Sequence, residues 1–164
     1  MSSSIKIYKS IQQLIGNKCK SIDTNSYYIL KKSAYNNNKN FNFLCWKSKC
    51  IYDEYSHDNK IFTIDYNINN DILKIKHLSI NNDYYEKNNI IKNNNLLTNE
   101  ETLKIKRYIF NYLSTMNINK ITIDIHSNLN RYNYELKDEG FVITNKRCYS
   151  NPFWIEAEKN VYKN

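Results

Sequence analysis

Two alternating stretches joined by a turn constrain this chain most, because together they predict a β-hairpin. Residues 61–68, IFTIDYNI, carry apolar side chains at every second position, the period of a strand with one buried face. The residues expected to share that face are Phe62, Ile64, Tyr66 and Ile68. The triplet NND at 69–71 is a tight-turn signal, and ILKIKHLSI at 72–80 follows as a second strand. The aromatic run at 41–55 predicts one or two more strands, so an antiparallel sheet beside the hairpin is expected.

The first forty residues carry weaker signals. Residues 10–21 fit a helix whose start would be capped by Ser10, with Gln13 completing a capping box. The apolar face of that helix would hold Ile11, Leu14 and Ile15. The run at 26–35 is compatible with either a strand or a helix. The polar stretch at 36–40 predicts a turn or loop.

The clearest helix follows a long asparagine-rich segment. Residues 81–97 have no clear period and predict a long loop, with room for one short element at its middle. Thr98, with Glu101 three residues later, forms the pattern of a capping box. The buried stripe of the helix that begins there is expected to contain Leu103, Ile105, Ile109, Tyr112, Leu113 and Met116.

The C-terminal third alternates strand and helix. Residues 121–125 predict a strand, and residues 129–139 predict a helix with Leu129, Tyr132 and Leu136 inward. Gly140, one of two glycines in the chain, is expected to end this helix, because glycine adopts left-handed backbone angles without strain. Two strands then follow around Pro152. The order of elements predicts an α/β fold with a mixed sheet, as one domain.

Composition limits the classes of function. The formal charge of +8 favours polyanionic partners such as nucleic acid or the phosphates of CoA, although the lysines are dispersed. Abundant Asn, Ile, Lys and Tyr indicate an AT-rich genome, such as that of a protozoan, a low-GC bacterium or a giant DNA virus. The cysteines are Cys19, Cys45, Cys50 and Cys148, and their spacing predicts no metal site. The start MSSSIKIYKS lacks the apolar core of a signal peptide, and no run is long enough to span a membrane, so a cytoplasmic location is expected.

The elements between about residues 60 and 155 resemble the GNAT superfamily of N-acetyltransferases. ILKIKHLSI at 72–80 resembles the long strand whose splayed end holds acetyl-CoA in that family. ITIDIHSNLN at 121–130 resembles the next strand with its trailing asparagine, and YELKDEGF at 134–141 resembles the helix ending in glycine and an aromatic residue. The resemblance implies a GNAT-like mixed, mostly antiparallel sheet flanked by helices, within one domain over residues 1–164.

The resemblance also implies transfer of an acyl group from acetyl-CoA to an amine. The residues that would contact CoA are Leu78, Ser79, Ile80 and Asn128 or Asn130. A base must accept the proton of the amine, and His77 on the long strand is the best-placed candidate, since imidazole is available in its neutral form near physiological pH. The alternative for His77 is an ordinary strand histidine, packed and hydrogen-bonded.

Two family features are replaced in this chain. In the family, a glycine-rich loop and a helix N-terminus cradle the CoA pyrophosphate. The corresponding segment here contains no glycine, and Glu100 and Glu101 stand at the helix start, where carboxylates repel a phosphate. The family's tyrosine that protonates the leaving thiolate is replaced by Leu136. Tyr132, one turn earlier, is a substitute, or else an ordinary core aromatic among 15 tyrosines.

Three functions are therefore compatible with the sequence. The first is an acyl-CoA-dependent N-acyltransferase with a CoA ester and an amine as substrates, which the ordered elements favour. The second is a GNAT-fold protein without catalysis, a basic module that binds nucleic acid or a protein partner. The third is an accessory or virion protein of a virus.

Overall fold

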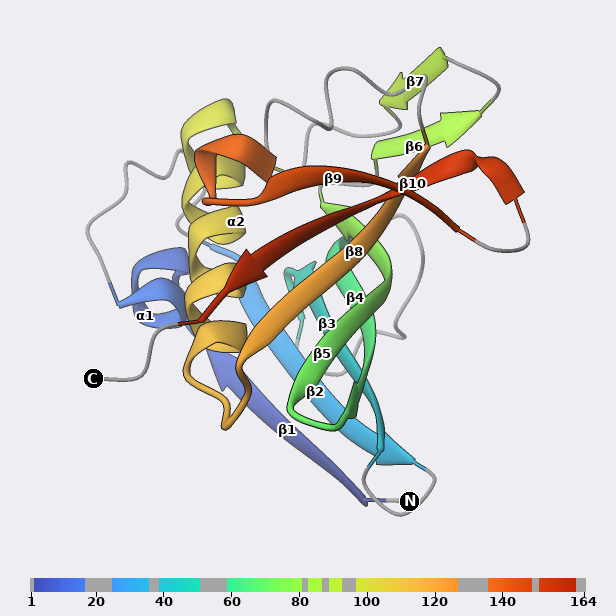
Figure 1. The fold of residues 1–164 in the computed structure, drawn as a ribbon. Coiled ribbons are helices and arrows are strands. Elements are labelled where there is room, and N and C mark those ends of the chain that lie inside the picture. Colours follow the sequence, from blue (N-terminus) through green and yellow to red (C-terminus); the bar gives the residue numbers. More distant parts are fainter. Residues whose placement is uncertain are drawn as a thin grey trace.

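The computed structural model describes residues 2–16, 25–35, 39–50, 59–80, 83–86, 89–92, 97–126, 136–148 and 151–161. The elements are β1 (Ser2–Tyr8), α1 (Ile11–Ile15), β2 (Tyr27–Tyr35), β3 (Asn40–Ser48), β4 (Lys60–Asn69), β5 (Ile72–Ile80), β6 (Asp83–Glu86), β7 (Asn89–Lys92), α2 (Asn99–Ser114), β8 (Lys120–His126), β9 (Val142–Cys148) and β10 (Asn151–Asn160). Figure 1 shows them.

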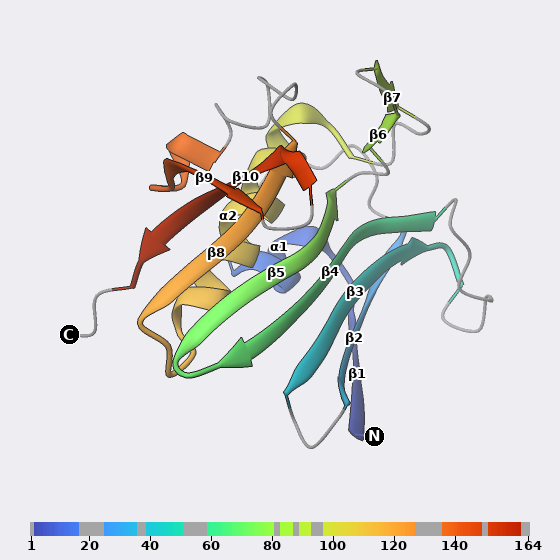
Figure 2. The same ribbon diagram turned by 45° about the vertical axis from the view of Figure 1, so that its right-hand side comes forward.

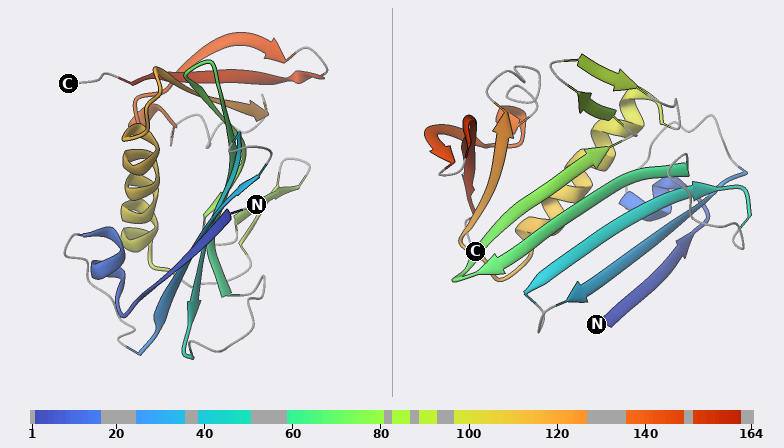
Figure 3. Two further views of the ribbon diagram at one scale, coloured as in Figure 1. Left: turned by 90° about the horizontal axis from the view of Figure 1, so that it is seen from below. Right: turned by 90° about the vertical axis from the view of Figure 1, so that its right-hand side faces the viewer.

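The main sheet has eight strands in the order β1-β2-β3-β4-β5-β8-β10-β9 (Figure 1). The pairing of β5 with β8 is parallel, and the other ladders of the described sheet are antiparallel. Figure 3 shows α1 and α2 on the same side of this sheet. The predicted α/β class, with a mixed and mostly antiparallel sheet, is confirmed.

β1 is an edge strand that the sequence pattern does not predict. It pairs antiparallel with β2 along its whole length. Ile5 and Ile7 are 52% and 49% exposed, so β1 lacks the buried face on which a periodicity argument depends. The run at 26–35, compatible with either class in the sequence, is the strand β2, which has β1 on one side and β3 on the other.

The first helix is shorter than predicted. Ser10 caps α1 as expected, because its side chain accepts a hydrogen bond from the Gln13 N–H. The Gln13 side chain instead accepts from the N–H of Lys9, at 2.9 Å, so the predicted capping box is not formed. α1 ends after Ile15, because Gly16 adopts a left-handed φ of 74° and its N–H bonds back to the helix.

The central hairpin is confirmed with its turn. Asn70 and Asp71 have φ angles of 52° and 63°, the left-handed values that two-residue hairpin turns require. β4 and β5 pair antiparallel on either side of this turn, and β3 lies on the other edge of β4 as predicted. Within the segment 81–97, β6 and β7 form a small antiparallel sheet of their own, so the prediction of a long loop is corrected there.

α2 begins at its predicted cap. The Thr98 side chain accepts from the Glu101 N–H, and the Glu101 carboxylate accepts from the Thr98 N–H at 2.9 Å, which completes the capping box. The predicted buried stripe is wrong at Leu103, which is 40% exposed. Leu103 lies two residues before Ile105, about 200° around the helix from it. Phe110, which the stripe omits, is buried instead.

Gly140 ends a helical turn as predicted. Its φ is 89°, and it follows the turn that contains Leu136. The Phe141 N–H bonds to the Leu136 carbonyl and the Gly140 N–H to the Lys137 carbonyl, the pair of bonds that closes a helix on a left-handed residue. The rest of the predicted helix, at 129–135, lies outside the described residues.

The core lies between the sheet and α2. Its fully buried side chains include Tyr28, Phe43, Phe62, Leu73, Ile105, Phe110, Leu113 and Ile121. Phe110 of α2 contacts Phe141 edge to face, with ring centroids 5.3 Å apart. Within the described part of the chain, no helix has the length and apolar character needed to cross a membrane.

Candidate functional site

The two parallel strands separate partway along their length. β5 and β8 pair from Ile72 opposite Lys120 to Ile75 opposite Ile123. β5 then stays paired with β4 as far as Ile80, while its ladder with β8 has ended. Figure 2 shows the two strands side by side at one end and apart at the other. The separation leaves a V-shaped gap in the ladder at the carboxyl ends of both strands.

A β-bulge lies on β5 where the strands separate. Ile75 is opposite Tyr66 of β4, but His77 is opposite Asp65, so Lys76 is an extra residue in β5. A bulge shifts the alternation of the side chains by one position. Lys76 and His77 are accordingly both exposed, one after the other.

The bulge sorts the predicted site residues of β5 onto two faces. Leu78 and Ile80 lie opposite buried residues of β4, so they belong to the face that α2 covers. His77 and Ser79 belong to the other face of the sheet. His77 and the three residues predicted to contact CoA, Leu78, Ser79 and Ile80, all lie on the part of β5 that is past the end of its ladder with β8.

His77 has an acidic neighbour across the strand pair. Its ladder partner Asp65 accepts a short hydrogen bond from the side-chain amide of Asn42 on β3. Asn42 in turn lies opposite Ser33 of β2, so these polar residues form a row on one face of the sheet. Cross-strand partners have Cβ atoms about 4.5–5.5 Å apart. In this structure the Asp65 carboxylate is bonded to Asn42 and not to His77.

Sequence reasoning missed Asp65 and Asn42. One signal was available, because Asp65 falls between the inward positions 64 and 66 of a strand whose other outward residues carry no charge until the turn. The cross-strand partner of Asp65 could not be predicted from the sequence pattern. A regular two-residue hairpin would place Asp65 opposite Lys76, and only the bulge moves it opposite His77.

An ion pair joins the two strands at the base of the gap. Lys74 Nζ lies 3.2 Å from Asp124 Oδ2, and the two residues come from β5 and β8. The other oxygen, Asp124 Oδ1, is buried and has no hydrogen-bond partner among the described residues. Glu156 of β10 lies directly opposite Asp124, so Lys74 compensates the repulsion between two carboxylates.

The N-terminus of α2 carries negative charge. Glu101 is 3% exposed, and its Oε2 atom is buried without a hydrogen-bond partner in the described structure. Glu100 is exposed and pairs with Lys104, one turn later, at 3.8 Å. The Glu101 N–H is already bonded to Thr98, so it is not free to bind a phosphate. This end of α2 is therefore a weaker anion site than a bare helix N-terminus.

Several predicted residues cannot be placed. Tyr132, Asn128 and Asn130 lie outside the described residues. Leu136, which the resemblance would place at the position of a catalytic tyrosine, is 2% exposed and part of the core.

The thiols and carboxylates of the described residues show no metal cluster. No group of three His, Cys, Asp or Glu side chains comes together in the part of the chain that the structure describes. Cys45 is a free thiol in the core, and burial raises its pKa far above the ordinary value. Cys50 is a free, exposed thiol.

This chain is similar to known proteins in its fold but not in its sequence. No family model and no curated protein sequence matches this chain. The structure is similar to the ribosomal-protein-S18-alanine N-acetyltransferase of Escherichia coli, with a TM-score of 0.50 and 8% identity over 99% of this chain and 96% of that one. An acetyltransferase of the GNAT family from Staphylococcus aureus Mu50 matches with a TM-score of 0.49 and 14% identity, over 97% and 100%. The spermidine N-acetyltransferase of Vibrio cholerae, solved with CoA and spermine, matches with 0.46 and 12%, over 76% and 68%.

Proposed function

We propose that this chain, which has the fold of the GNAT N-acetyltransferases, is a divergent acyl-CoA-dependent N-acyltransferase that forms one domain over residues 1–164. The observation that carries the proposal is the separation of β5 from β8 with His77 on the separating strand. A gap between two parallel strands offers an extended substrate arm a path along β5, and it ends beside a side chain that can accept a proton.

The acyl donor would lie along the last residues of β5. In this proposal the pantetheine arm of acetyl-CoA follows the backbone of Leu78, Ser79 and Ile80, which permits any side chains at these positions. Asn128 or Asn130 would contact the arm from the segment after β8. The pyrophosphate would gain little from α2, because the Glu101 N–H is capped and two carboxylates stand at the helix start.

His77 would act as the general base. The amine nitrogen attacks the thioester carbonyl, a C–N bond forms, and the C–S bond breaks with its electron pair going to sulfur. The nitrogen loses one proton to His77, and the thiolate gains one from an acid, for which Tyr132 is the candidate. Asp65 is a positioning residue, because its carboxylate attracts the imidazolium that forms. Asn42 holds that carboxylate through its amide.

Calorimetric titration with acetyl-CoA at low and moderate salt tests the proposal. We expect saturable one-to-one binding that survives moderate salt, since backbone contacts to pantetheine are insensitive to ionic strength. Acetyl-pantetheine, which lacks the nucleotide, should retain most of the affinity. Absence of binding by both donors would exclude the enzyme.

Site variants then test the chemistry in an amine screen. His77→Gln should lower kcat/KM about 100-fold or more, the usual contribution of a general base. Asp65→Asn should lower it less, about ten-fold, with donor affinity unchanged, as a positioning role requires. Lys76→Gln is the matched control, because Lys76 is the exposed neighbour of His77 on the same strand. Equal losses in the His77 and Lys76 variants would remove His77 from the mechanism.

A second candidate function is a non-catalytic module inside a cell or a virion that binds nucleic acid or a protein. A surface hollow of about 400 Å³ between α1 and α2 favours it, because Lys104, Arg107 and Tyr108 line this hollow. Basic and aromatic side chains together suit single-stranded nucleic acid. Salt-dependent binding of a single-stranded oligonucleotide, combined with no binding of acetyl-CoA, would select this function.

A further inference from the structure

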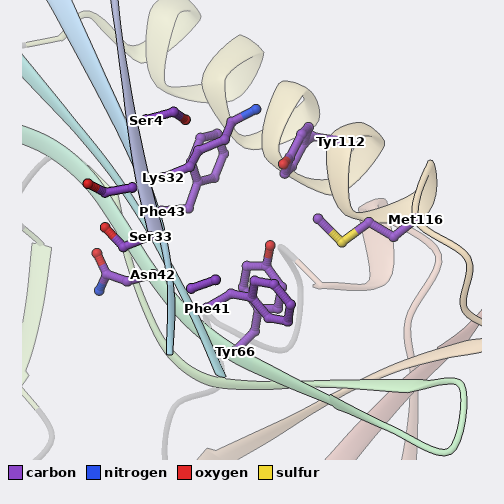
Figure 4. Close-up of a pocket in the computed structure, with 11 residues that line it drawn as sticks. Ser4, Lys32, Ser33, Phe41, Asn42, Phe43, Tyr66, Tyr112 and Met116 are labelled. Carbon is purple, nitrogen blue, oxygen red and sulfur yellow. The ribbon is translucent and has the colours of Figure 1, made fainter. Parts of the chain in front are cut away.

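A second hollow lies under the C-terminal half of α2. It has a volume of about 380 Å³ and opens between α2 and the face of β1 to β4 (Figure 4). Residues of β5 and β8 are absent from its described lining, so it is separate from the gap between those strands. Its size falls in the range of pockets that bind small organic molecules.

Aromatic rings form most of the wall. Phe41 and Tyr66 stack with their centroids 5.0 Å apart and their planes 13° from parallel. Phe43 contacts Tyr112 of α2, with centroids 4.9 Å apart. Figure 4 shows these rings and Met116 around one space. A flat apolar body would find ring faces and edges on several sides there.

Lys32 is the cationic side chain in the described lining of this hollow. Lys32 Nζ lies 4.1 Å from the centroid of Tyr112 and 5.2 Å from that of Phe43. Among the described residues, no carboxylate lies within ion-pair distance of Lys32 Nζ. Among the described residues, the partners of this charge are therefore aromatic rings, and no described acid neutralises it.

The other polar side chains in the described lining of the hollow are uncharged, and each can donate a hydrogen bond to an anion. Figure 4 shows the hydroxyls of Tyr66 and Tyr112 turned into the space beside Met116. Burial raises the pKa of Tyr66 far above its ordinary value, with Tyr112 contributing, so its hydroxyl stays protonated. Among the described residues that line the hollow, none is Asp or Glu. A ligand that pairs with Lys32 must bring its own negative charge.

We propose that this hollow binds a small aromatic carboxylate, at a site distinct from the acyl-transfer gap. The carboxylate lies at Lys32 and within reach of a tyrosine hydroxyl, and the ring lies against Phe41 and Tyr66. An ion pair in this half-buried place is charge-assisted, so it contributes more than a neutral hydrogen bond. The stacked rings select flat molecules over branched ones.

Titration calorimetry with 2-naphthoate tests this site directly. We expect saturable binding at one site, and binding of the neutral isostere 2-naphthamide about ten-fold weaker or worse, as loss of a charge-assisted bond implies. Lys32→Met keeps the apolar stem and removes the charge, so naphthoate should bind it no better than naphthamide binds the native protein.

Lys31→Met is the matched control. Lys31 is the next residue of β2, its side chain faces the other side of the sheet, and it is half-buried like Lys32. The affinity of the Lys31→Met variant for naphthoate should equal that of the native protein. Ala34→Phe, which adds a ring to the lining of the hollow, is a second variant that should abolish binding without removing a charge.

Three results would overturn the proposal. The first is no saturable binding of 2-naphthoate at millimolar concentration, and the second is equal affinity for acid and amide. The third is displacement of naphthoate by acetyl-CoA, which would place it in the gap between β5 and β8. A protein that binds naphthoate but no acetyl-CoA would keep this proposal and lose the enzymatic one, so the two fail separately.

Discussion

The two ends of α2 differ in the charge of the side chains around them. At the N-terminus the helix dipole favours an anion, yet Glu100 and Glu101 supply carboxylates there and the cap occupies the Glu101 N–H. Beside the C-terminal half the dipole disfavours an anion, yet Lys32 lies over Tyr112 in a hollow whose described lining holds no acidic residue. At both ends, the charged side chains thus oppose the effect of the helix dipole on an anion. Anion binding near α2 is expected to depend on these side chains more than on the dipole.

The largest expected effect is a loss of stability caused by truncating an aromatic residue in the wall of the hollow. Phe43 is 1% exposed and contacts Phe62, Tyr112 and Lys32, so it belongs to the core as well as to the hollow. Phe43→Ala should lower the free energy of unfolding by about 3–5 kcal/mol, measured by urea denaturation. Met116→Ala, at the half-buried rim, should cost less than half of that. Equal costs would mean that Phe43 contributes no more to stability than a half-buried rim residue, contrary to its place in the core.

The second effect appears at alkaline pH. Burial raises the pKa values of Tyr66 and Tyr108 above the ordinary value of 10.0, so the folded state keeps protons that the unfolded state has lost. The contribution of these two tyrosines to the free energy of unfolding should therefore be constant below about pH 10 and fall above it, by at most about 1.4 kcal/mol per pH unit for each tyrosine. The buried Cys45 thiol, whose pKa is also raised, should add a fall that begins near pH 9.

Thermal unfolding from pH 8 to 11 measures this slope. Tyr66→Phe should flatten it, and Tyr35→Phe, at an exposed position, should not. An unchanged slope in the Tyr66 variant would contradict the protonated hydroxyl proposed for the hollow.

The third effect concerns the cap at the acidic end. Thr98→Ala removes the acceptor for the Glu101 N–H, which should cost about 1 kcal/mol of unfolding free energy. Thr115→Ala, at the other end of the same helix, should cost less, because its hydroxyl bonds to a carbonyl in an exposed position. If Thr115→Ala costs more, the capping box does not stabilise the start of α2.

The smallest effect is on donor affinity. Glu100→Gln and Glu101→Gln each remove a charge near the helix start while keeping an acceptor oxygen. Acetyl-CoA should bind each variant about two- to five-fold more tightly in calorimetry, since such charges interact with a helix end by 0.3–1 kcal/mol. Asp138→Asn, which removes an exposed carboxylate before Gly140, is the control. Unchanged affinity of the Glu variants for acetyl-CoA would mean that the pyrophosphate does not approach α2.

Local patterns were enough to predict much of the fold. The NND turn, the capping box of Thr98 and Glu101, and the left-handed Gly140 all hold in the structure, because each depends on neighbours within five residues. The predictions failed where an element owes its state to distant partners. β1 is a strand because β2 pairs with it, and β6 and β7 pair within a polar segment that carries no period.

The candidate site divides in the same way. The sequence places His77 on a strand and names the residues after it, since alternation and turn chemistry act over short distances. The bulge in β5 places Asp65 opposite His77, and the gap begins where the ladder between β5 and β8 ends. The hollow under α2 joins Lys32 and Tyr112, which are far apart in the chain. Such contacts are set when sheet and helix pack together, because side chains from several elements must fill one volume, and no local pattern contains that condition.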